Sequence, residues 1–92
     1  MKKWYIGPNI VLREEADDWG ILFDPDTGNS VVLNPVAISM FKAMRKTQDI
    51  DGVAAAIRAE YTDIPESLEE DITTFVNSLA ENGFIGFEAS EE

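Results

Sequence analysis

DDWGILFDPDTGNSVVLNP, residues 17–35, is the stretch of sequence that decides the fold. Trp19, Ile21 and Phe23 alternate with smaller or polar neighbours, which is the period of a strand with one buried face. Proline and glycine within residues 24–29 favour a tight turn. The uncharged run Ser30-Val31-Val32-Leu33 then predicts a returning strand, and Asn34-Pro35 predicts the start of a helix, as cap and first helical residue.

The segments on either side of this stretch complete a small sheet. Ile10–Arg13 predicts a first strand, and three strands joined so closely favour an antiparallel meander. Residues 1–8, which end at Gly7-Pro8, and residues 89–92 are expected to be flexible tails. Phe84–Phe87 has two open interpretations: it adds a short strand, or it folds back over the core and covers Ser30–Leu33.

Three helices should follow the meander. The first begins at Asn34-Pro35, the second is capped by Asp49, and the third opens with the capping-box pattern Ser67-x-x-Glu70. The third has the most regular apolar stripe, with residues spaced by three and four: Leu68, Ile72, Phe75, Val76 and Leu79. Strands followed by helices predict one α+β domain over residues 1–92, winged-helix-like in its elements.

Composition excludes several classes of function. The chain has 92 residues, seven Lys and Arg against 18 Asp and Glu, a net charge of −11, and neither Cys nor His. Such a charge repels nucleic acid and anionic membranes. The sequence carries no paired-carboxylate, phosphate-loop or metal-ligand motif, so we expect no enzymatic activity and no cofactor. No stretch approaches the ~20 apolar residues of a membrane span, which favours a cytoplasmic protein.

The strand Ser30–Leu33 should form an edge of the meander. Edge strands are normally protected by charge or proline, because their unpaired N–H and C=O groups recruit other chains. The opposite edge carries Arg13, Glu14 and Glu15, whereas Ser30–Leu33 carries neither charge nor proline. Such an edge is either covered or used, and addition of a peptide strand is a recurrent use. The same edge also allows a homodimer through pairing of two copies.

Taken in order, these motifs resemble the PqqD-like family of peptide chaperones, also called RiPP recognition elements. The resemblance covers about residues 10–86 and rests on the order and spacing of short motifs. One departure is Met44–Gln48, where family members often carry Asp-Gly between the first two helices. The matching positions are Trp19, Leu22, Phe23, Pro25, Gly28, Leu33, Asn34, Pro35, Ala37, Tyr61, Phe75, Leu79, Gly83, Phe84 and Ile85.

The resemblance implies a role in natural product biosynthesis. Family members bind the leader segment of a ribosomally made precursor peptide and present it to a modifying enzyme, often a radical S-adenosylmethionine enzyme. The leader is bound as an added strand beside the third strand, next to the third helix. The site residues that we predict on this basis are Ser30, Val31, Val32, Leu33, Asp71, Ile72, Phe75, Val76 and Leu79.

The elements and the charge of the chain also suggest two alternatives to peptide binding. A winged-helix DNA-binding regulator would place its third helix in the major groove, but residues 66–82 carry five carboxylates and no Lys or Arg. That electrostatic arrangement excludes the regulator. An acidic inhibitor or antitoxin-type protein that masks a basic surface remains open on composition, and it would bind in a strongly salt-dependent way. Apolar residues in a helical stripe such as that of the third helix are more often part of the core than in contact with a ligand.

Overall fold

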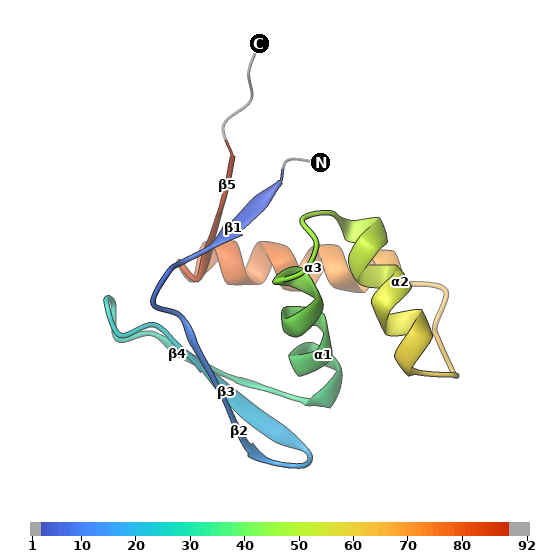
Figure 1. Ribbon diagram of the computed structural model, residues 1–92, viewed down its shortest axis with the longest axis horizontal. Helices are drawn as coiled ribbons and strands as arrows, with labels where there is room; N and C mark the ends of the chain where they lie inside the picture. The colour runs from blue at the N-terminus through green and yellow to red at the C-terminus, as the bar shows by residue number, and fades with distance from the viewer. Residues whose placement is uncertain (1–2, 89–92) are drawn as a thin grey trace.

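Two small antiparallel sheets and three helices make up the structure, a computed structural model that describes residues 3–88 (Figure 1). The larger sheet is the predicted meander, in the order β2-β3-β4. The three helices follow it along the chain, so the predicted α+β class is confirmed. The bounds are β1 Trp4–Ile6, β2 Val11–Ala16, β3 Trp19–Phe23, β4 Ser30–Leu33, α1 Pro35–Met44, α2 Ile50–Glu60, α3 Leu68–Glu81 and β5 Ile85–Phe87.

Two of the three predicted helix caps form. The Asn34 side chain accepts a hydrogen bond from the backbone N–H of Ala37 at 2.8 Å, and Asp49 accepts one from Gly52 at 2.6 Å. Each cap satisfies a donor that the first helical turn would leave unpaired. The predicted capping box of α3 is wrong. Ser67 precedes the helix but makes no capping bond with its side chain, and its hydroxyl donates to Asp71 instead, at 3.1 Å.

Helix α1 lies against one face of the meander, which becomes the inner face. Leu22 and Leu33 point to this side and are 0% and 3% exposed. Gly20 also lies on it, where a Cβ would approach Ile38 of α1 to 3.1 Å. The aromatic residues of β3 point the other way, and Trp19, which the alternating pattern placed on the buried face, is 38% exposed. The buried face of β3 is therefore the face with glycine and leucine.

The smaller sheet corrects the prediction of a tail at residues 1–8 for residues 3–8, since residues 1–2 lie outside the described part of the chain. β1 pairs with β5, so that Trp4 lies opposite Phe87, near the two ends of the described chain (Figure 1). Trp4 is 1% exposed, and its indole N–H donates to the carbonyl of Met44 at 3.1 Å. Gly7 donates to the carbonyl of Phe84 at 3.2 Å. The tail prediction is wrong for these residues. They are ordered because β1 pairs with β5, from the far end of the chain, and because the Trp4 indole is buried in the core. The predicted tail at 89–92 lies outside the described residues.

We expect the substitution Trp4→Ala to be strongly destabilising, because it removes the largest fully buried side chain and its hydrogen bond. The free energy of unfolding should fall by about 3–5 kcal/mol, a large share of the roughly 5–15 kcal/mol typical of such domains. Urea unfolding followed by circular dichroism measures the loss. Tyr5→Ala is the matched control, because Tyr5 is 57% exposed in the same strand, and it should cost less than about 1 kcal/mol. Equal midpoints for W4A and wild type would mean that β1 is not docked.

Candidate functional site

Strand β4 is an open edge of the meander. It pairs with β3 on one side, while β5 pairs with β1 and does not cover it. The interpretation in which Phe84–Phe87 covers β4 is therefore wrong. Within residues 3–88 no strand lies on the second side of β4.

The turn before β4 determines which backbone groups face this edge. Asp24 donates to the carbonyl of Asn29 at 2.9 Å and accepts from the N–H of Gly28 at 2.8 Å. Gly28 has φ of 82°, a left-handed conformation that glycine adopts without strain. Gly28 and Asn29 together lie opposite Asp24, as in a β-bulge whose first residue is a glycine. It makes Asp24 and Asn29 a hydrogen-bonded pair.

Hydrogen-bonded and non-hydrogen-bonded pairs alternate along an antiparallel ladder. Since Asp24 and Asn29 are hydrogen-bonded, the pair of Leu22 with Val31 is hydrogen-bonded too. The N–H and C=O groups of Ser30 and Val32 consequently point away from β3, toward the open edge. The edge thus offers two donors and two acceptors to an added strand, in the pattern that an extended peptide complements.

Helix α3 carries a row of side chains along one side, and its C-terminal end meets the turn of the meander. Asp71, Phe75 and Ser78 recur at intervals of four and three residues and therefore share one side of the helix. Asn82, the residue that ends α3, continues this side, and its carbonyl accepts a hydrogen bond from the Asn29 side chain at 2.8 Å. This bond ties the start of β4 to the end of α3, and no pattern in the sequence predicts it. We call Asp71, Phe75 and Ser78 the α3 row.

The structure separates the predicted site residues into two groups. Ser30, Val32 and Asp71 are exposed, Val32 by 65%, while Val31 and Phe75 are half-buried. These five lie at the β4 edge or in the α3 row. The remaining four have side chains that are at most 3% exposed, because they form the core beneath the edge and the helix, namely Leu33, Ile72, Val76 and Leu79.

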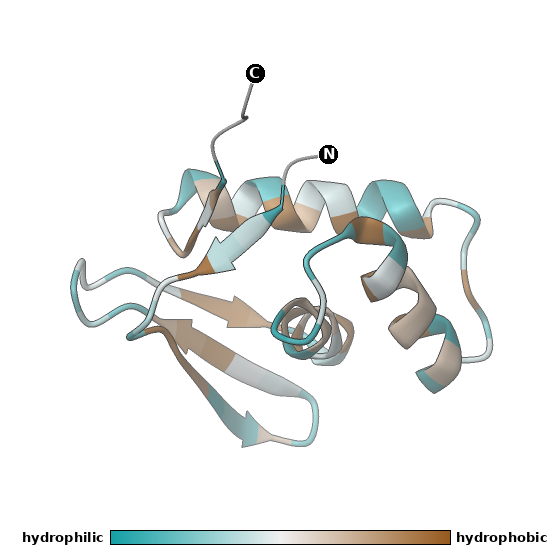
Figure 2. Ribbon diagram, turned by 45° about the horizontal axis from the view of Figure 1, so that its top comes forward, coloured by the Kyte–Doolittle hydropathy of each residue, from teal (hydrophilic) through white to brown (hydrophobic). Residues whose placement is uncertain are grey.

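Helix α3 carries many hydrophilic residues (Figure 2), and its first turn is acidic, with Glu69, Glu70 and Asp71. Arg58 of α2 donates to Glu69 at 2.7 Å, and this hydrogen bond, with a smaller backbone contribution, holds the pKa of the Glu69 carboxyl below its usual value. Glu70 and Asp71 have no cation partner within the described chain. A peptide beside the α3 row would therefore meet apolar surface at Phe75 and negative charge at Asp71. Residues 3–88 contain no cluster of potential metal ligands and no helix long and apolar enough to cross a membrane.

An α+β domain with an open strand edge and an amphipathic third helix belongs to the kind of small module that can bind an extended peptide. The family model for coenzyme PQQ synthesis protein D (PqqD) matches residues 20–85, well over half of the chain. The chain belongs to the PqqD family. No curated protein sequence matches it.

Two solved structures share the fold over nearly their whole length. One is TbiB1 in complex with the TbiA(beta) leader peptide, with a TM-score of 0.74 and 24% identity over 98% of this chain and 100% of that one. The other is lasso peptide synthetase B1 complexed with the leader peptide, with a TM-score of 0.72 and 26% identity over 91% of this chain and 98% of that one.

Hydrogen exchange tests the edge without any ligand. The N–H groups of Ser30 and Val32 should exchange about tenfold or more faster than those of Val31 and Leu33, because only the latter pair with β3. Exchange measured residue by residue by NMR gives the comparison. Equal protection of all four N–H groups would show that another segment or a second copy covers the edge.

Proposed function

We propose that this chain binds the leader segment of a ribosomally synthesised precursor peptide by strand addition to β4. The observation that carries this proposal is the uncovered edge at Ser30 and Val32, whose backbone groups point away from β3. Membership in the PqqD family and the leader-peptide complexes formed by the two structural neighbours support it.

The alternation of side chains along strands determines what the leader would contact. Residues of an added strand that point to the inner face would lie between Val31 and the α3 row, while those beside Val32 would face solvent. Val31 and Phe75 are both half-buried and apolar, so they suit apolar leader residues. Each such side chain would contribute about 1.5–3 kcal/mol on full burial. Ordering a flexible leader offsets several kcal/mol, which gives low-micromolar to nanomolar affinity.

Asp71 would give the site a preference for leaders that carry positive charge. Its carboxylate lies in the α3 row with the Ser67 hydroxyl at 3.1 Å, and α3 has no Lys or Arg. A leader with Lys or Arg one or two positions from its apolar anchors would place opposite charge beside Asp71. We infer that such leaders bind more tightly than acidic ones, and that the preference weakens with salt.

The chain itself would act without catalysis, in the cytoplasm, as a carrier that presents the precursor to a modifying enzyme. A radical S-adenosylmethionine enzyme is the partner that we propose. The edge of a second copy would compete with the leader for β4, so a homodimer through this edge would be a resting form that leader binding dissociates.

Replacing Val32 with proline tests the site directly. Proline removes an N–H that the proposed leader needs and is tolerated at an open edge, where Val32 is 65% exposed. We expect leader affinity to fall about 100-fold, or about 2.7 kcal/mol, since a peptide carbonyl loses its donor and meets the ring. The measurement is an NMR titration with synthetic leaders of candidate precursors. Val32→Thr is the matched control, because it keeps the N–H and nearly the same shape, and it should bind as wild type does.

Two results would overturn the proposal. One is a folded V32P variant that binds leaders normally. The other is binding that disappears at about 0.5 M salt, where the Debye length is only about 4 Å. The second result would favour an acidic inhibitor that masks a basic surface, because strand addition depends on backbone hydrogen bonds and apolar contacts.

A further inference from the structure

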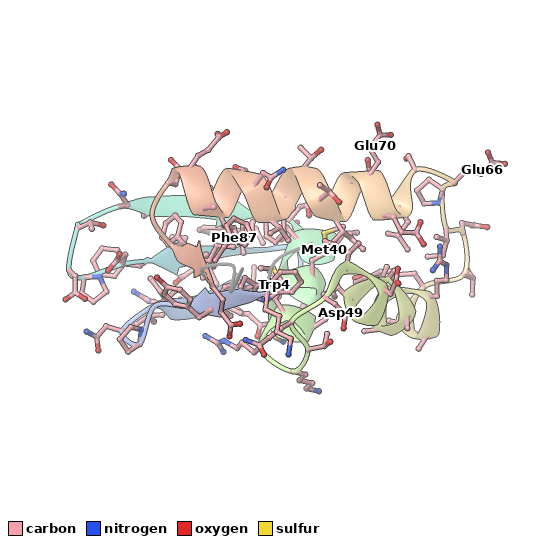
Figure 3. The ribbon with its side chains drawn as sticks, turned by 90° about the horizontal axis from the view of Figure 1, so that it is seen from above. Trp4, Met40, Asp49, Glu66, Glu70 and Phe87 are labelled. Carbon is pink, nitrogen blue, oxygen red and sulfur yellow. The ribbon has the colours of Figure 1, made fainter. Side chains whose placement is uncertain are left out.

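A hollow of about 540 Å³ lies between strand β1 and the connection from α1 to α2. Its lining comes from two segments that are far apart in the sequence, Trp4–Pro8 with Ile10, and Met44–Gln48. Neither β4 nor α3 contributes to it. Figure 3 shows Trp4 and Asp49 on the side of the molecule away from Glu70 of α3, so the hollow and the α3 row are separate surfaces.

Strand β1 presents an open edge to this hollow. Glu88 donates to the carbonyl of Lys3 at 2.8 Å, and Gly7 donates to the carbonyl of Phe84 at 3.2 Å, so Lys3 and Gly7 both belong to hydrogen-bonded pairs with β5. By alternation, the backbone groups of Trp4 and Ile6 point away from β5.

Gln48 confirms this direction and occupies part of the edge. Its side-chain amide donates to the carbonyl of Trp4 at 2.7 Å. The N–H of Trp4 and the N–H and C=O of Ile6 remain on the same edge. The hollow therefore has backbone donors of the kind that an extended peptide takes up.

The hollow also gathers positive charge in a chain that is otherwise acidic. Three of the basic residues that the structure describes are paired with carboxylates: Arg13 with Glu15, Lys42 with Glu14 and Arg58 with Glu69. Arg45 and Lys46 have no ion pair within residues 3–88, and both line the hollow. The Arg45 guanidinium lies 4.8 Å from the centre of the Phe41 ring, a cation–π contact that holds it in place.

We propose that this hollow is a second peptide-binding site, which takes an extended, carboxylate-rich segment of the modifying enzyme. Arg45 and Lys46 bind its carboxylates, and the edge of β1 binds its backbone. Only the identity of the partner rests on the proposed function; the site itself rests on the β1 edge and the two cations. The net charge of −11 repels acidic segments elsewhere on the surface, so the hollow also selects where the partner docks.

Two separate sites would let the module hold both partners at once. The leader occupies the edge of β4, and the enzyme holds the edge of β1. Docking at the hollow would then raise the concentration of the bound precursor near the enzyme without displacing the leader.

The test uses a defined probe, the acetylated peptide amide Glu-Val-Glu-Val-Glu, titrated into the labelled full-length chain and followed by NMR. We expect shifts at Trp4, Ile6 and residues 45–48 and none at Ser30–Leu33. The Lys-Val-Lys-Val-Lys peptide should cause none at the hollow. The double variant R45E/K46E should weaken binding about tenfold or more, because like charges then face each other. The control R13E/K42E lowers the net charge by the same amount outside the hollow and should bind the probe much more tightly than R45E/K46E does.

Three outcomes would overturn the proposal: no shifts at the hollow, equal binding by R45E/K46E and its control, or the same shifts with inorganic phosphate, which would indicate an anion site only. The proposals for the leader site and for the hollow can be overturned independently of each other. V32P should keep the acidic probe and lose the leader, whereas R45E/K46E should keep the leader and lose the probe. Once the enzyme is identified, R45E/K46E should weaken its binding about tenfold with leader affinity unchanged.

Discussion

The close approach of helix α1 to the meander is the constraint on which the rest of the structure depends. Gly20 accommodates both this approach and the close pairing of β3 with β2. A Cβ there would lie 2.8 Å from the carbonyl of Arg13 and 3.1 Å from Ile38. With α1 in this place, Leu22 and Leu33 are buried on the inner face and the aromatic residues of β3 point outward. The direction of every side chain on β4 follows, since a strand has only two faces.

The direction of backbone groups is decided in the same way at both ends of the molecule. At β4, the turn with Gly28 fixes the pairing, which leaves Ser30 and Val32 facing outward. At β1, the bonds to β5 leave Trp4 and Ile6 facing outward. Among residues 3–88 no further strand extends either sheet, and the two proposed sites use the edges of β4 and β1. Short strands limit the number of such groups, which keeps unwanted pairing weak.

The distribution of charge distinguishes the two edges from each other. Asp71 lies in the α3 row, whereas Arg45 and Lys46 line the hollow beside the edge of β1. Peptides of opposite charge would therefore prefer different edges, although the backbone chemistry of both edges is the same. In a chain with a net charge of −11, two cations without carboxylate partners make a larger local contrast than they would on a neutral surface.

The sequence by itself determined the local elements: the meander, the caps at Asn34 and Asp49, and a β4 strand without charge or proline. These depend on neighbours along the chain, so short patterns carry them. Only the tertiary structure decided which stripe residues of α3 are core, because a helical period does not say which elements pack on it. It also decided the place of Trp4, whose partners Met44 and Phe87 are far along the chain. A strand of three residues has no period of its own to read, and its order comes from those distant contacts.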